Sequence, residues 1–140
     1  VVLGALMLFL FVGFAVTLTD AGITLRNDSG RDVPFEPSYI LADVQRVFYP
    51  WLDGAAPDDG SRDGIHDDLA VTERYAGGRL VERRFTRIAE PERGDVVITY
   101  EGWTAENPIA PARVVLVNGW YGYTLEIDTF DVTLDVERAE

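Results

Sequence analysis

Residues 113–127 read RVVLVNGWYGYTLEI, and this stretch decides how the rest of the chain is interpreted. Apolar residues flank Asn118-Gly119, a dipeptide that favours the tight turn of a β-hairpin because both residues tolerate a positive φ. It is the strongest short hairpin signal in the chain. We therefore expect two antiparallel strands, Arg113–Val117 and Trp120–Ile127.

Similar patterns lie on the N-terminal side of this hairpin. Leu69–Tyr75 and Arg79–Ile88 alternate between apolar and polar residues, and Ala76-Gly77-Gly78 between them is a second turn signal. Asp95–Glu101 and Ile23–Asn27 show the same alternation. These four segments are predicted as further strands.

The remaining elements are one helix and a C-terminal strand. Residues 130–137 alternate, as in an antiparallel strand with one face in water. A helix is predicted over residues 37–49, because Pro37 suits a first helical position, Pro50 ends the element, and the apolar residues between them share one face. Seven strands and a short helix favour an α+β chain whose head, residues 22–140, is a mostly antiparallel, immunoglobulin-like β-sandwich.

The N-terminal residues differ from this head. Residues 1–19, VVLGALMLFLFVGFAVTLT, carry no charged side chain. Nineteen residues at about 1.5 Å each give a helix of roughly 28 Å, close to the thickness of a bilayer core. Residues 1–21 are therefore predicted as a separate hydrophobic helix, buried on all sides in lipid or in protein. A signal peptide is disfavoured, because a basic start and a small-residue cleavage site are missing. A membrane anchor and a filament core stay open.

The run Leu3-Gly4-Ala5-Leu6-Met7-Leu8-Phe9-Leu10-Phe11-Val12 resembles the mature N-terminus of archaeal type IV pilins and archaellins. The resemblance implies a hydrophobic helix, exposed by removal of a leader, and a β-rich head. Ala5 stands where bacterial pilins usually have Glu, which favours the archaeal branch. Small residues let helices approach closely. The expected assembly residues are Leu3, Gly4, Leu6, Leu8, Leu10 and Gly13.

Composition narrows the function classes. The chain has 24 acidic residues, 12 basic residues that are all Arg, no Lys and no cysteine. A net charge of −12 disfavours nucleic acid as a partner, and the lack of cysteine excludes disulfides and Cys-zinc sites. Such a composition resembles proteins of salt-loving archaea, because screening over about 3 Å at molar salt makes a large surface charge tolerable. No nucleophile motif or phosphate loop is present, so an enzyme is not predicted.

An Asp-rich segment, Leu52–Asp68, is predicted as a loop and is the one candidate metal site. Asp59, Ser61, Asp63 and Asp67 fall at positions 1, 3, 5 and 9 of an EF-hand-type calcium loop. Position 12 is Ala70 rather than the bidentate Glu, so Ca²⁺ would bind weakly. The alternative is an acidic surface loop, and no other cofactor is expected.

Arginines concentrate between residues 79 and 93. Arg79, Arg83, Arg84 and Arg87 are a candidate interface that would face the Asp-rich segment of a neighbouring copy. The alternative is pairing with nearby carboxylates on exposed strands, worth about 0–1 kcal/mol per pair.

Asn27-Asp28-Ser29 is the only N-x-S/T sequon with a permitted middle residue, and it falls in a predicted turn, so Asn27 is a candidate glycosylation site.

Two functions are expected from these features. The first is a structural subunit of an extracellular archaeal pilus-like filament, a homo-oligomer whose N-terminal helices pack in the core after a stage in the membrane. The second is a single-pass, membrane-anchored binding or accessory protein of a cell envelope or virion, with its β-sandwich outside.

Overall fold

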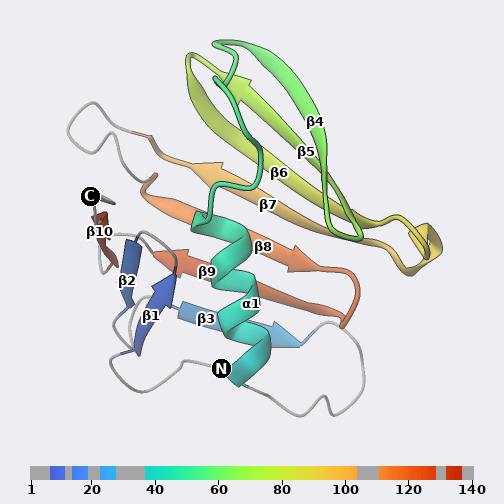
Figure 1. The fold of residues 1–140 in the computed structure, drawn as a ribbon. Helices are drawn as coiled ribbons and strands as arrows, with labels where there is room; N and C mark the ends of the chain where they lie inside the picture. The colour runs from blue at the N-terminus through green and yellow to red at the C-terminus, as the bar shows by residue number, and fades with distance from the viewer. Residues whose placement is uncertain are drawn as a thin grey trace.

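The computed structural model describes residues 7–11, 14–18, 23–27, 37–103, 111–128 and 132–136. Within these ranges, seven antiparallel strands form one open sheet in the order β3-β9-β8-β7-β6-β5-β4, and helix α1 lies across one face of it (Figure 1). The edges of this sheet are β3 and β4. The strands are β3 (Ile23–Asn27), β4 (Gly60–His66), β5 (Leu69–Ala76), β6 (Arg79–Arg87), β7 (Asp95–Glu101), β8 (Arg113–Asn118) and β9 (Tyr123–Asp128).

Most of the predicted elements are confirmed. β3 and β7 have the predicted bounds, and α1 (Pro37–Phe48) matches the predicted helix to within one residue. β9 begins at Tyr123 rather than Trp120, because the turn is wider than a two-residue hairpin. The Asn118 side-chain oxygen accepts hydrogen bonds from the backbone N–H groups of Trp120 and Tyr121, at 3.0 and 3.1 Å, and so holds these residues in the turn.

The prediction of a helix over residues 1–21 is wrong for the part that the structure describes. β1 (Met7–Phe11) and β2 (Phe14–Leu18) form an antiparallel pair, and β10 (Val132–Val136) pairs with the other side of β2. A continuous apolar run does not by itself distinguish a buried helix from buried strands. Here β10, in which apolar and polar residues alternate, pairs with the backbone of β2.

Two of the six predicted assembly residues fall in the part of the chain that the structure describes, and they lie in a strand rather than in a helix. Leu8 and Leu10 lie in β1. Leu3, Gly4, Leu6 and Gly13 lie outside the described residues. The described part of the chain contains no helix that is long and apolar enough to cross a membrane.

The antiparallel β character is confirmed, but the immunoglobulin-like arrangement is not. β4 to β9 each pair with their neighbour in sequence, so they form a meander without the Greek-key crossover of that fold. A 12-residue helix, rather than a second large sheet, packs on the face of this meander. Periodicity predicts which residues form strands, but it does not predict their order in the sheet.

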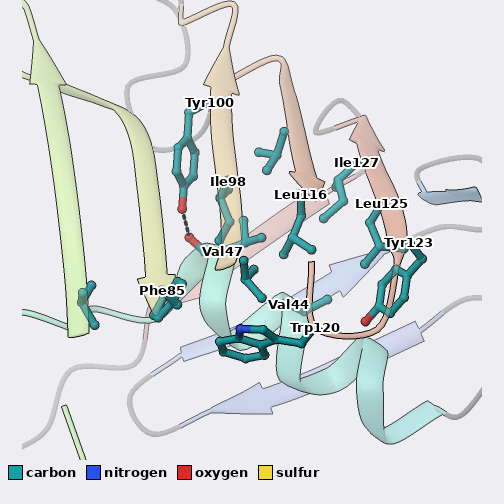
Figure 2. Packing of buried hydrophobic residues seen from close by; sticks show 13 residues of the cluster. Val44, Val47, Phe85, Ile98, Tyr100, Leu116, Trp120, Tyr123, Leu125 and Ile127 are labelled. Atoms are coloured by element: carbon teal, nitrogen blue, oxygen red, sulfur yellow. Dashed lines mark hydrogen bonds between the residues drawn. The ribbon is translucent and has the colours of Figure 1, made fainter. Parts of the chain in front are cut away.

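The core lies between α1 and this sheet (Figure 2). Val44 and Val47 of α1 are buried and face apolar side chains from β6 to β9. Each fully buried Val, Leu, Ile or Phe contributes about 1.5–3 kcal/mol. The residues that the sheet contributes to this core cluster are Val71, Phe85, Val96, Ile98, Tyr100, Val114, Leu116, Tyr123, Leu125 and Ile127.

Candidate functional site

Asp43 is a carboxylate of α1 with 0% exposure, and it is held by internal donors. It accepts hydrogen bonds from the Tyr123 hydroxyl, from Arg46 Nη1 at 2.8 Å and from Asn118 Nδ2 at 3.3 Å. Burial raises the pKa of Asp43, and the hydrogen bonds and the Arg46 charge offset only part of this effect. These contacts tie α1 to β8 and β9, so Asp43 has a positioning role in the fold.

Glu73 of β5, 1% exposed, is the second buried carboxylate. Arg83 donates to it from Nε at 2.8 Å, Arg62 from Nε at 2.9 Å and the Tyr75 hydroxyl at 2.7 Å. Burial alone raises the pKa of Glu73, but the Arg83 charge and these hydrogen bonds outweigh it, so the pKa lies below its usual value. Glu73 is therefore a charged centre that joins β4, β5 and β6.

The C-terminal end of α1 is fixed to the sheet by Arg83 and Tyr100. Carbonyls in the last turn of a helix lack helical donors. Arg83 Nη1 donates to the carbonyls of Arg46 and Val47 at 2.7 and 2.9 Å, and the Tyr100 hydroxyl donates to Val47 at 2.6 Å (Figure 2). Burial raises the pKa of Tyr100 to about 12, so its hydroxyl keeps its proton near neutral pH.

The predicted interface of four arginines is not a continuous strip. Successive side chains of a strand point to opposite faces, so β6 divides them. Arg83, only 6% exposed, lies under α1, which excludes it from a surface interface. Arg84 is exposed and pairs with Asp95 at 2.9 Å. Arg79 and Arg87 lie over the rings of Trp103 and Trp120.

The four predicted calcium ligands are not brought together either. The segment predicted as a loop contains strand β4, and Ser61 and Asp63 lie on it with exposed side chains. Asp59, whose carboxylate accepts a hydrogen bond from the Gly77 N–H, and Asp67 lie beyond its two ends. A strand rises about 3.3 Å per residue, so Asp59 and Asp67 are roughly 25 Å apart along it. Among the described residues, no group of three or more His, Cys, Asp or Glu could hold a metal ion.

Asn27 is the last residue of β3 and pairs with Tyr123 of β9. The predicted strand Ile23–Asn27 is confirmed, and the rest of the turn predicted to start at Asn27 lies outside the described residues. The other two residues of the sequon lie outside the described ranges.

The strongest candidate for a functional surface is the outer edge of β4. β4 pairs with β5 and has no second strand beside it in the described part of the chain. Asp67-Asp68 is a two-residue turn, so its flanking pair, His66 and Leu69, exchanges hydrogen bonds. Hydrogen-bonded and non-hydrogen-bonded pairs alternate from there. The N–H and C=O groups of Ser61, Asp63 and Ile65 therefore point away from the sheet.

The side chains of these three residues are also exposed, and Ile65 is 74% exposed. A large apolar side chain on a free strand edge is a typical feature of a docking surface or of an aggregation hazard. We call the backbone edge of Ser61, Asp63 and Ile65 the β4 edge.

A cavity of about 400 Å³ adjoins the β4 edge. Its lining comes from Arg62–His66 and from the segment after α1, including Trp51, Leu52 and Ala55. Gly64 has no side chain to fill this space, and Leu52 lies against it. The His66 ring packs edge-on against Trp51, with ring centroids 4.9 Å apart. The cavity therefore has one aromatic wall, and its lining is otherwise mostly polar, with Asp53, Arg62 and Asp63 contributing to it.

The sequence contained a weak signal for β4. Residues 60–66, a two-residue Asp-Asp turn and the strand that follows have the spacing of a hairpin. Gly and Asp are depleted in strands, and their abundance here favoured a loop. Because the segment is predicted as a loop, the sequence does not identify Trp51, Leu52, Ile65 and His66 as residues around the cavity beside β4.

Comparison with known proteins gives a family but no described activity. Neither the curated proteins nor the solved structures contain a significant match to this chain. Residues 12–131 match DUF3261, a family described as a protein of unknown function, and because this match spans most of the sequence, the chain belongs to that family.

Proposed function

We propose that this protein is a binding protein that captures an extended segment of a partner along the β4 edge. The observation that carries the proposal is the row of outward backbone groups at Ser61, Asp63 and Ile65 beside the cavity. An added strand gains affinity from main-chain hydrogen bonds, and pockets for alternate side chains give specificity.

Charge indicates the kind of partner. Leu52–Asp68 contains six Asp, and Asp63 lies in the middle of the β4 edge. A second copy of the chain would bring Asp63 near its own equivalent, and each copy carries a net charge of −12. Like charges directly opposite one another destabilise a strand pair. The β4 edge therefore fits a segment that alternates basic and apolar residues.

This proposal agrees with the expected binding or accessory protein and needs no membrane helix. The expected filament subunit relied on a helical N-terminal core, and β1 and β2 lie within that segment. The filament role stays a prediction that the described residues do not support. The buried carboxylates Asp43 and Glu73 are engaged in the fold, so neither supports an enzyme proposal.

The test uses the whole chain, isotope-labelled, and a short capped peptide of alternating Arg and Val. We expect saturable shifts of the Ser61, Asp63 and Ile65 amide signals and slower exchange of their N–H groups. Asp63→Pro should abolish binding while β4 stays paired with β5, because the Asp63 N–H points away from β5. Asp63→Asn is the matched control, since it keeps the N–H and should weaken binding only several-fold.

A peptide in which Glu replaces Arg should not bind. Unchanged binding of the Arg-Val peptide to the folded Asp63→Pro variant would refute edge pairing. Shifts confined to residues outside β4 would do the same.

A further inference from the structure

A second surface feature is independent of the β4 edge and involves Trp120, Arg46 and Arg87. The guanidinium carbon of Arg46 lies 4.9 Å from the centroid of the Trp120 ring, and that of Arg87 lies 4.4 Å from it. Trp120 is only 8% exposed, and its Nε1 donates to the Gly94 carbonyl at 2.8 Å. The ring is thus a fixed platform, and the two guanidinium groups are less than about 10 Å apart, close enough for both to attract one anion.

Among the residues that the structure describes, Arg87 has no counter-charge. No carboxylate of the described residues lies within 4.0 Å of it, and none of them makes a hydrogen bond to its guanidinium. In contrast, Arg62 and Arg83 pair with Glu73, and Arg84 pairs with Asp95. An unpaired Arg is unexpected in a chain with twice as many acidic as basic residues.

Arg46, the second guanidinium at the Trp120 ring, is paired with a carboxylate, but that carboxylate does not also neutralise Arg87. In the described part of the chain Arg46 pairs with one carboxylate, Asp43, which is also held by Tyr123 and Asn118. The cluster of Arg46, Arg87 and Asp43 therefore carries an excess positive charge beside the Trp120 ring.

Both arginines have a buried Nε–H without an acceptor among the described residues. A buried donor without an acceptor is unfavourable, so packing on Trp120, rather than hydrogen bonding, holds the Arg87 guanidinium. Arg46 is held by the same ring and also by its hydrogen bond to Asp43. Arg87 as a whole is half-buried rather than buried, so a ligand that approaches from solvent would meet its Nη–H donors.

We propose that Arg87, assisted by Arg46, binds an oxyanion of a ligand, a carboxylate or a phosphate group. The planar guanidinium presents paired N–H donors that match two oxygens of such a group. Trp120 fixes the guanidinium in advance, so less side-chain entropy is lost on binding.

The test follows the Arg Nε–H and Trp Nε1–H signals of the whole chain by NMR during titration with sodium phosphate, at ionic strength held constant with sodium chloride. A parallel titration uses sodium acetate, so that the two arms distinguish phosphate from carboxylate. We expect saturable shifts of the Arg46, Arg87 and Trp120 signals in at least one arm.

Arg87→Gln should weaken binding by about tenfold or more, because it removes charge-assisted hydrogen bonds. Arg84→Gln, an exposed arginine of the same strand that faces the other side, is the matched control and should change the affinity less than about twofold. Arg87→Lys keeps the charge without the planar fork and should give an intermediate affinity.

Linear shifts without saturation in both arms would overturn the proposal and leave stacking on Trp120 as the sole role of Arg87. Equal loss of binding in Arg84→Gln and Arg87→Gln would also overturn it, since general electrostatic attraction would then explain the shifts. Circular dichroism confirms that each variant is folded, and Arg87→Lys keeps the test valid if Arg87→Gln does not fold.

Discussion

Glu73 and Asp43 are both buried carboxylates, but their pKa values are shifted in opposite directions in the native state. Burial raises the pKa of each, and only at Glu73 do the Arg83 charge and the hydrogen bonds from Tyr75, Arg83 and Arg62 outweigh burial. The native state therefore favours charged Glu73 and disfavours charged Asp43. Replacing each carboxylate by its amide should have very different effects on stability.

Glu73→Gln leaves the 6% exposed Arg83 guanidinium without its counter-charge. Removing one partner of a buried ion pair costs about 3–5 kcal/mol, against a total stability of about 5–15 kcal/mol for a typical domain. Asp43→Asn removes a charge that burial already disfavours, and Arg46 keeps contact with water because its side chain is 16% exposed. We expect a cost of about 1 kcal/mol or less for this second variant.

The pH dependence separates the two variants further. The pKa of Glu73 is lowered in the native state, so its stabilising contribution is present above the unfolded value of 4.5 and is lost as the pH falls through the lower native value. The pKa of Asp43 is raised, so its contribution is present below the unfolded value of 3.8 and is lost as the pH rises through the native value. The penalty of Glu73→Gln should therefore shrink in acid, whereas Asp43→Asn should become relatively less stable there.

Urea unfolding at fixed salt, followed by tryptophan fluorescence, measures both variants at neutral pH and in acid. The reasoning fails if Asp43→Asn loses as much stability as Glu73→Gln at neutral pH. It also fails if the Glu73→Gln penalty stays constant well below the usual glutamate pKa of about 4.3.

Two further predictions concern the turn and the end of the helix. Gly119→Ala places a Cβ 2.6 Å from the Asp95 carbonyl oxygen, so backbone must move, and we expect a loss of about 1–3 kcal/mol in urea unfolding. Gly64→Ala meets only the flexible Leu52 side chain and should cost less; the reverse order would contradict the packing described. Tyr100→Phe removes the hydrogen bond to Val47 and should cost about 1 kcal/mol. Because the native pKa of Tyr100 is raised to about 12, its contribution is lost as the pH rises through that value, and ultraviolet titration of the variant should lack one late-ionising tyrosine.

Local sequence patterns predicted the elements better than their arrangement. β3, β7 and α1 could be predicted because alternation, Pro37 and Pro50 are local signals. The N-terminal strands could not, because an apolar run has no period and its conformation depends on a distant partner, β10. The position of β4 at a sheet edge is likewise a property of the strand order.

The same limit applies to the candidate sites. Arg83 and Arg84 are adjacent and chemically identical, yet one is buried under α1 and the other is exposed. Period-two alternation predicts that they face opposite sides, but not which side α1 covers. The pairing of Arg87 with Trp120 joins residues far apart in sequence, so no local motif indicates it.

The contacts that hold α1 also affect how the chain folds during synthesis. The partners of Asp43 at Asn118 and Tyr123 lie 75 and 80 residues later in the chain. At about 5–20 residues per second, Asp43 is incorporated roughly 4–16 s before Tyr123. Until then the apolar side of α1, with Val44 and Val47, has no β8 or β9 to cover it. We therefore expect nascent chains to pass through a stage in which the apolar side of α1 is uncovered, and slowing translation after residue 100 should prolong that stage.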